Sequence, residues 1–288
     1  MSNNIITFAV NKLIMSKLIT GNETNIVYFS EWIKDFRCYG AITKILDKYQ
    51  VKHELLSFTK DYWARDYMPV QTSESTFIQY CYNPDYLQAK TSYITDPTAC
   101  CKHLNIDTIK TDIVIDGGNI IKCKDAIIMT DKVLCENPTY SKSELINQLE
   151  VLFQAELILI PWDRKEPYGH ADGMVRFIKD KKILLNNYMD FDRGLRKNLV
   201  KVLSPHFEII ELHYNVSKLS ELSWAYINFL QVGNLILLPA MGIDEDEQAL
   251  CLFKEIFNTN IEQIDVSEIV PQGGALNCIS WNIKQLLN

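Results

Sequence analysis

One pattern of apolar and polar positions recurs along the chain. It has two stretches in which apolar residues alternate with polar ones, a stretch with an apolar residue at every third or fourth position, and a last alternating stretch. Alternation predicts β-strands, and a spacing of three to four predicts an amphipathic helix. The pattern therefore predicts a module of two strands, a helix and a third strand, with clear copies at 118–161, 174–214 and 226–266.

Two further copies are weaker, and one of them is divided between the ends of the chain. Their predicted elements are a hairpin at 70–80, a helix near 97–105, strands at 111–116 and 275–283, and, near the N-terminus, a strand at 25–30, a helix at 31–46 and a strand at 51–58. A closed ring of five modules, an α/β propeller, explains the divided copy. An ordinary open α/β sheet also alternates strands and helices, so periodicity alone leaves both architectures open.

Length and charge narrow the class of protein. The 288 residues suit one catalytic domain, expected over 25–288, with an N-terminal extension over 1–24. The 29 basic residues are outnumbered by 36 acidic ones, which argues against a nucleic-acid partner because such proteins carry a clustered basic face. No apolar run reaches the roughly 18 residues of a membrane-spanning helix.

The cysteines and the N-terminus indicate the compartment. Eight cysteines are present, and none forms a Cys-x-x-Cys pair. This usage predicts reduced thiols rather than a disulfide framework or a structural zinc site. The first 20 residues lack the apolar core of a signal peptide, so a cytoplasmic location is expected.

A polar or reactive residue precedes the first strand of every module. These residues are Asp66, Asn119, Asp172, Asn228 and Cys278, and their successive separations are 53, 53, 56 and 50 residues. Equivalent positions of modules arranged around an axis converge on that axis. The spacing therefore predicts one central pocket that contains a thiol, two carboxylates and two amides.

Four short segments contain these residues. They are 63–66 (Trp-Ala-Arg-Asp), 116–119 (Asp-Gly-Gly-Asn), 169–172 (Gly-His-Ala-Asp) and 273–278 (Gly-Gly-Ala-Leu-Asn-Cys). A thiolate at Cys278 is a competent nucleophile, and His170 can transfer protons near neutral pH. Carboxylates would repel the negative charge of an acyl intermediate, but they match a planar guanidinium cation. Arg65 is expected to anchor its loop through a salt bridge.

These segments resemble, in family order, the motifs of the guanidine-modifying superfamily, and most closely its agmatine deiminase and bacterial peptidylarginine deiminase-like branch. The resemblance implies a closed α/β propeller of five ββαβ modules. It also implies that Cys278 is the nucleophile and His170 the general acid and base. Asp66 and Asp172 would hold the guanidinium, and Asp116 would hold the substrate or orient His170.

The resemblance also implies the reaction. A guanidino compound would be hydrolysed to a ureido product and ammonia through a covalent amidino-thioether, without a metal or organic cofactor, as part of polyamine metabolism. Trp63, Asn119 and Asn228 would line the substrate pocket. The expected partner is a small guanidino substrate, and a homodimer is the assembly common for enzymes of this size.

Three departures from the family pattern concern the substrate. Asp116 stands where the family usually has glutamate, Asn277 stands where the agmatine branch has histidine, and 279–282 (Ile-Ser-Trp-Asn) replaces a threonine–glutamine run. Agmatine is therefore the first candidate among several guanidino compounds. Two alternatives stay open: an amidinotransferase that passes the amidino group to an amine, and an inactive relative that only binds guanidino ligands.

Overall fold

The computed structural model describes residues 17–285. Within this range the strands form five separate three-stranded sheets. In every sheet the central strand pairs antiparallel with one neighbour and parallel with the other. The parallel pair is the one joined by a helix, as parallel strands require a crossover connection. The five predicted modules of an α/β fold are thus confirmed.

The modules share the order strand, strand, helix, strand. The module divided between the chain ends consists of β15 (Ser280–Ile283), β1 (Ile26–Ser30), α1 (Cys38–Lys48) and β2 (Lys52–Leu56). The next consists of β3 (Val70–Gln71), β4 (Phe77–Cys81), α3 (Thr98–His103) and β5 (Ile109–Val114). The third consists of β6 (Ile121–Lys122), β7 (Ala126–Thr130), α4 (Lys132–Glu136), α5 (Lys142–Phe153) and β8 (Glu156–Ile160).

The last two modules follow the same order. One consists of β9 (Val175–Lys179), β10 (Lys182–Leu185), α6 (Tyr188–Phe191), α7 (Arg193–Leu203) and β11 (Glu208–Glu211). The other consists of β12 (Leu230–Val232), β13 (Leu235–Ala240), α8 (Asp246–Ile256) and β14 (Asn260–Asp265). The short helix α2 (Ala64–Tyr67) lies between the first two modules in the chain.

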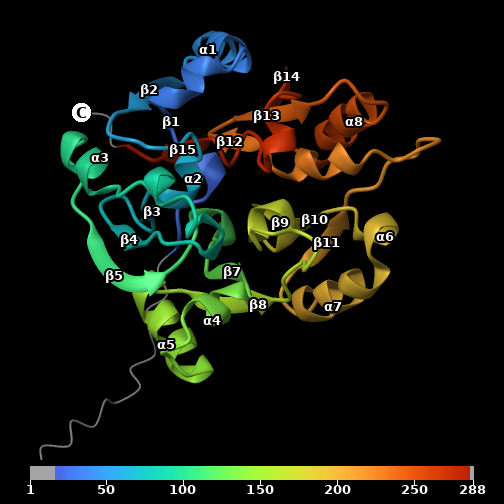
Figure 1. Cartoon of the computed structure of the whole chain (residues 1–288). Coiled ribbons are helices and arrows are strands. Elements are labelled where there is room, and N and C mark those ends of the chain that lie inside the picture. The colour runs from blue at the N-terminus through green and yellow to red at the C-terminus, as the bar shows by residue number, and fades with distance from the viewer. Residues whose placement is uncertain (1–16, 286–288) are drawn as a thin grey trace, which may run out of the picture.

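Figure 1 shows the sheets around a common centre, with α1, α3, α5, α7 and α8 at the periphery. Every residue of the central strands β1 and β7 is buried, because each sheet is covered on both faces. The divided module is complete, since β1 pairs with β15 from Ile26 opposite Ile283 to Phe29 opposite Ser280. Among residues 17–285 no strand ladder joins one sheet to the next.

The turns before the first strands contact one another in sequence order. These are α2 and the 3-10 turns Gly117–Asn119, Ala171–Gly173, Glu221–Ile227 and Val270–Gln272, and α2 also contacts β15. Asp66, Asn119 and Asp172 lie in these turns, Asn228 directly follows one, and Cys278 lies between the last turn and β15. The fold therefore gathers those residues at one end of the five first strands.

Two predicted elements begin later than expected. The helix predicted at 31–46 starts at Cys38, because Ser30 accepts a hydrogen bond from the Trp32 amide and a separate 3-10 turn forms at Glu31–Asp35. The strand predicted at 275–283 starts at Ser280. Before it, the amides of Asn277 and Cys278 donate to Asn228 instead of to a strand neighbour.

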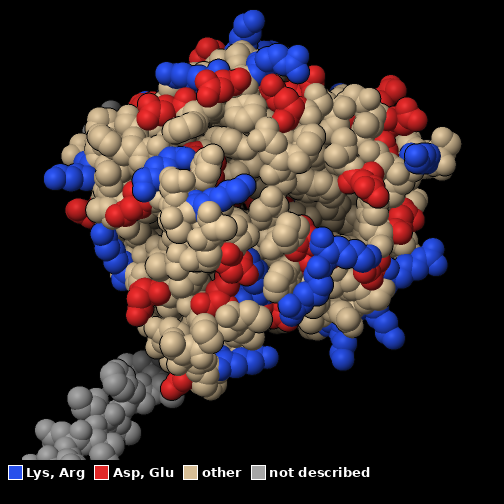
Figure 2. All heavy atoms as spheres, in the orientation of Figure 1, with Lys and Arg blue, Asp and Glu red and all other residues tan. Residues whose placement is uncertain are grey.

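The described part of the segment before β1 packs against the modules. Leu18 is fully buried, and its amide donates to the carbonyl of Lys124, while the carbonyl of Gly21 accepts from Gly233. None of the helices within residues 17–285 is long and apolar enough to cross a membrane. Acidic and basic side chains are interspersed over the face shown in Figure 2.

Candidate active site

Cys278 lies beside a carboxylate at the centre of the molecule. Its Sγ is 3.5 Å from Oδ2 of Asp172 and can donate to it. The same oxygen accepts hydrogen bonds from the side-chain amides of Asn228, at 3.0 Å, and Asn277, at 2.7 Å. Cys278 is 6% exposed and Asp172 is 2% exposed, so thiol and carboxylate interact where water screens little.

Asn228 positions the loop that carries the thiol. Its Oδ1 accepts from the amides of Ala275, at 3.1 Å, and Cys278, at 3.2 Å, and its carbonyl accepts from the amide of Asn277. The carbonyl of Cys278 in turn accepts from the amide of Arg65 at 3.0 Å. Groups that precede two other modules, Asn228 and Arg65, thus fix the backbone around Cys278, which keeps its side chain in one place.

His170 lies between two carboxylates. Its Nε2 is 2.9 Å from Oδ2 of Asp116, and its Nδ1 is 3.7 Å from Oδ1 of Asp66. The Asp66 carboxylate is held in place by the amide of Gly118, which donates to it at 3.1 Å. Each carboxylate interacts with a different ring nitrogen, so the two together fix the orientation of the imidazole.

Burial and charge shift the pKa values of these groups. Burial alone would lower the pKa of His170, but the carboxylates of Asp66 and Asp116 raise it to about 10. Burial raises the pKa of Asp66 to about 7, although the His170 charge opposes the shift. Burial and the charges of Asp172 and Asp66 raise the pKa of the Cys278 thiol well above its usual value. At neutral pH the imidazole is therefore charged and the thiol is neutral.

One polar atom of the site has no partner among the described residues. Oδ1 of Asp116 is buried and accepts no hydrogen bond, although the other oxygen of the same carboxylate binds His170. Leaving a buried carboxylate oxygen unpaired is costly. This oxygen is therefore available to a donor that enters the site.

The side chains of two predicted site residues make no hydrogen bond to the thiol or the imidazole. Asn119 is 2% exposed, and its Oδ1 accepts from the amide of Thr130 in β7, so its side chain supports the sheet. Trp63 packs on the glycine pair before the thiol, because a Cβ on Gly274 would be 2.2 Å from its ring. The other six predicted residues are brought together as described.

The structure also adds residues that the sequence did not single out. Glu166 accepts from the amides of Tyr168 and Gly169, and so holds the loop before His170. Tyr168 and Tyr86 flank the His170 ring at centroid distances of 6.0 and 6.1 Å. The sequence signal for Glu166 and Tyr168 was their closeness to the Gly-His-x-Asp segment at 169–172, and no sequence signal pointed to Tyr86.

The expectation that Arg65 forms a salt bridge is wrong. Arg65 donates to neutral oxygens, through Nη2 to Oδ1 of Asn282 at 2.6 Å and through Nε to the carbonyl of Asn277 at 3.4 Å. Within residues 17–285 no carboxylate lies at salt-bridge distance from it. The loop is anchored by hydrogen bonds to amide groups instead.

Gly118 permits the close approach of two site residues. A Cβ at this position would be 2.6 Å from Nδ1 of His170 and 2.8 Å from Oδ1 of Asp66. Gly118→Ala is therefore expected to displace these two side chains and to lower kcat/KM by about 10²-fold, the cost typical of a 1 Å misplacement. Steady-state kinetics with a guanidino substrate measures this.

Gly173→Ala is the matched control, because a Cβ there meets nothing within 4 Å although the position follows Asp172. It should keep activity within about twofold. Equal losses in the two variants would show that the contact between Gly118 and the site does not matter.

Comparison with known proteins assigns the chain to a family. The family model of Porphyromonas-type peptidyl-arginine deiminases matches residues 19–283. The chain belongs to this family. The match covers all five modules and every residue of the site described above.

Individual proteins that are similar to the chain support its assignment to this family. A Mycoplasma capricolum protein that is provisionally named an agmatine deiminase is 25% identical over 219 residues, which is 62% of this chain and 60% of that protein. The chain thus matches less than two thirds of the length of this curated relative. The agmatine deiminase of C. jejuni superposes with a TM-score of 0.76 at 19% identity, covering 94% of this chain and 97% of that one.

The same fold occurs with a second chemistry. SxtG, an amidinotransferase of Microseira wollei, superposes with a TM-score of 0.65 at 13% identity, covering 95% of this chain and 98% of that one. The chain therefore has the α/β fold that deiminases and amidinotransferases share. At these identities the superpositions establish the fold, while the chemistry depends on the residues of the site.

Proposed function

We propose that this member of the peptidyl-arginine deiminase family hydrolyses a small guanidino compound through a covalent intermediate on Cys278. The observation that carries the proposal is the buried thiol beside the Asp172 carboxylate, in a site that also holds His170 between Asp116 and Asp66. The carboxylates of Asp172 and Asp66 act on the thiol, and such charges suit a cationic electrophile and disfavour an anionic intermediate. A guanidinium ion is planar, always charged, and donates in a fork that matches carboxylates.

The substrate would lie between the two halves of the site. Asp172 and Asp66 would accept hydrogen bonds from opposite sides of the guanidinium, which places its central carbon near Sγ of Cys278. The unpaired Oδ1 of Asp116 would accept a further N–H group. Trp63, packed on Gly274 beside the thiol, would cover one side of the pocket. Asn228 would act through the loop it positions, and Asn119 through the sheet.

The first half-reaction forms the thioether. Entry of the cation favours the thiolate, because it offsets the charges of Asp172 and Asp66 that keep the thiol protonated. Since His170 is already charged, the thiol proton is released to solvent. The thiolate attacks the guanidinium carbon, and a C–N bond breaks. The charged imidazole of His170 gives its proton to the departing nitrogen, so that ammonia leaves and an amidino-thioether stays on Cys278.

The second half-reaction releases the product. His170 is now neutral and can accept a proton from a water molecule, which attacks the amidino carbon. The C–S bond breaks, the second proton of the water passes to the departing sulfur and regenerates the thiol, and the ureido product leaves. The charge of the imidazole is restored by the proton from water, so the cycle ends as it began.

The proposal extends to the substrate, to the closure of the fold and to the location of the protein. Agmatine is the first candidate substrate, because the relatives of this family that match the chain are named for it. A closed five-fold propeller is supported by the succession of contacts between the turns around the site. A cytoplasmic location is supported by the eight free cysteines, since reduced thiols persist in reducing compartments.

The proposal is tested with a set of guanidino compounds. The full chain is incubated with agmatine, arginine and short arginine peptides, and ammonia and the ureido product are measured. Ammonia and ureido product in equal amounts from at least one compound are expected. Transfer of the amidino group to an added amine, with little ammonia, would instead identify an amidinotransferase, and no turnover of any compound would overturn the proposal.

The pKa of Asp66 predicts an acid limit of activity. This carboxyl, with a pKa of about 7, is protonated at lower pH and then no longer attracts a cation. We therefore expect kcat/KM to fall about tenfold per pH unit below pH 7, as one proton competes with the substrate. The alkaline limit is expected where His170 loses its proton, near a pKa of about 10.

The same competition can be measured without turnover. Calorimetric binding of a guanidinium ligand to Cys278→Ser should release a proton at pH 6 and little at pH 8.5, seen as a dependence of the heat on the buffer. A value of kcat/KM that stays constant between pH 5.5 and 7.5 would contradict this account of Asp66.

A further inference from the structure

A cavity of about 70 Å³ is lined by residues of the short first strands that lead away from the site. We call the polar residues before the first strands, Asp66, Asn119, Asp172, Asn228 and Cys278, the first ring. Four polar strand residues line the cavity, and each follows a residue of the first ring by three or four positions: Lys122, Arg176, Gln231 and Asn282. The cavity is thus a second layer of the repeat, next to the first, since Arg65 and Asn277, the chain neighbours of Asp66 and Cys278, also line it.

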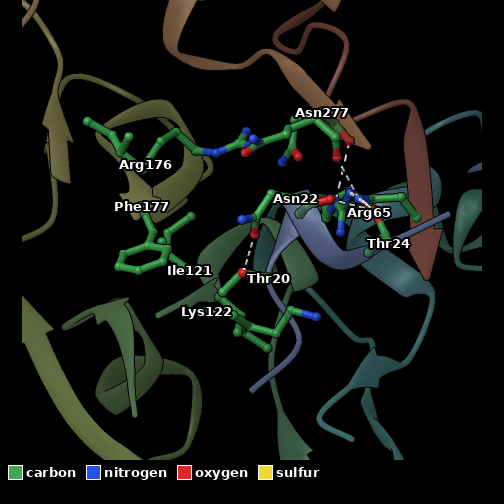
Figure 3. Close-up of a pocket in the computed structure, with 14 residues that line it drawn as sticks. Thr20, Asn22, Thr24, Arg65, Ile121, Lys122, Arg176, Phe177 and Asn277 are labelled. Carbon is green, nitrogen blue, oxygen red and sulfur yellow. Dashed lines mark hydrogen bonds between the residues drawn. The ribbon is translucent and has the colours of Figure 1, made fainter. Parts of the chain in front are cut away.

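Three cations line this cavity, and none has a carboxylate at salt-bridge distance within residues 17–285. Arg176 donates to the carbonyl of Phe229 at 2.9 Å and lies over that ring at 4.3 Å. Lys122 donates to the carbonyl of Gln71 at 2.8 Å. Arg65 donates to the neutral oxygens described above. Figure 3 shows the three side chains around the cavity, with Asn22 and Thr20 between them.

The nearest carboxylates are already engaged. Glu23 forms a salt bridge with Lys124 and accepts from the amide of Thr20. Asp172 influences both arginines from beyond Asn277, but its Oδ2 accepts from Asn277, Asn228 and the thiol. The cavity therefore holds more positive than negative charge.

The cost of this arrangement is visible in the cations themselves. Burial and the neighbouring charge of Arg65 lower the pKa of Lys122 to about 7, and burial lowers the pKa of Arg176 to about 10. Gathering buried cations without counter-charges is unfavourable. An anion in the cavity would offset that cost.

We propose that this cavity binds a small oxyanion of the size of inorganic phosphate. Guanidinium groups offer forked donors that match oxyanions, and an ammonium group adds a point charge. The side-chain amides of Asn22 and Gln231, which also line the cavity, supply neutral donors. The volume suits an ion of about five heavy atoms, since one water molecule needs about 10–15 Å³. The site does not depend on the proposed deiminase function.

Isothermal titration of the full chain with sodium phosphate tests this, with sulfate as a second oxyanion, AMP as a bulkier phosphate and sodium chloride as the ionic-strength control. Phosphate and sulfate are expected to bind with one site per chain and to raise Tm, whereas AMP and chloride are not. Equal binding of AMP and phosphate would overturn the assignment of a small oxyanion. No binding of either oxyanion would overturn the site itself.

Two variants locate the site. Arg176→Gln should weaken phosphate binding at least tenfold, the loss expected for a charged hydrogen bond. Arg193→Gln, on the exposed surface of α7, makes the same change in charge and should leave binding unchanged. Equal affinities in wild type and Arg176→Gln would place the anion elsewhere.

Lys122→Met is a second variant, whose Tm with and without phosphate tests the site even if Arg176→Gln does not fold. It keeps the aliphatic stem and removes an uncompensated charge, so we expect an unchanged or higher Tm in phosphate-free buffer. The rise of Tm with phosphate should shrink. A lower Tm without phosphate together with an unchanged response to phosphate would contradict the proposal. Phosphate binding that persists in Cys278→Ser would confirm that the first ring is not the anion site.

Discussion

Cys278→Ser is expected to lower kcat for a guanidino substrate by at least about 10⁴-fold. A serine hydroxyl is far less nucleophilic than a thiolate, and removing a catalytic nucleophile costs factors of this order or more. The fold should persist, because the hydrogen bonds that fix this loop are made by the backbone of Cys278 and not by its sulfur. Ammonia release at saturating substrate, with Tm as the check on folding, measures the effect.

Cys251→Ser is the matched control, since Cys251 is an exposed thiol on α8. It should retain full activity. Mass spectrometry with a chloroamidine should show one adduct that is lost in Cys278→Ser and kept in Cys251→Ser. Undiminished turnover by Cys278→Ser would remove the proposed mechanism altogether.

Asp172→Asn is expected to lower kcat/KM by about 10³-fold. The carboxylate would hold one side of the guanidinium and lies 3.5 Å from the thiol. Breaking a buried ion pair costs about 3–5 kcal/mol, and each 1.4 kcal/mol is a factor of ten. An amide at this position also turns an acceptor of two side-chain amides into a group that competes with them.

Asp180→Asn serves as the control for Asp172→Asn. Asp180 is exposed in the hairpin between β9 and β10 with a φ of 51°, a conformation that asparagine also adopts readily. Activity within twofold of wild type is expected. A loss below tenfold in Asp172→Asn would show that this carboxylate does not hold the substrate cation.

The repeat was predictable because its determinants are local. Alternation in 174–188 and in 226–240 marks hairpins whatever the neighbours are, and the spacing of the polar residues before them follows from the module length. The association of Cys278 with Asp172 and Asn228 then follows from repetition. That part of the site needed no knowledge of packing.

The direction in which each side chain points was not predictable, because it depends on which hydrogen-bond partner the fold brings close to that side chain. Asn119 occupies the expected ring position, yet its amide turns to Thr130 in its own sheet. Asn277 seemed to be only a departure from the family pattern, but it binds Asp172 and its carbonyl accepts from Arg65. The two partners of Asn277 are neighbours in space that lie more than 100 residues away in the chain, whereas Thr130 is 11 residues from Asn119, and the sequence period reports neither kind of partner.

The pairing of β15 with β1 has a consequence for the order of events during synthesis. The ladder between β1 and β15 can form only after Ile283 has been made, 257 residues after Ile26. Closing a loop of that length costs about 5 kcal/mol in chain entropy, and only the hydrogen bonds and contacts of the finished β15 offset this cost. Cys278, the proposed nucleophile, is made only five residues before Ile283. A nascent chain that has not reached residue 278 therefore lacks both this sulfur and the ladder between β1 and β15, so the proposed activity does not precede completion of this module.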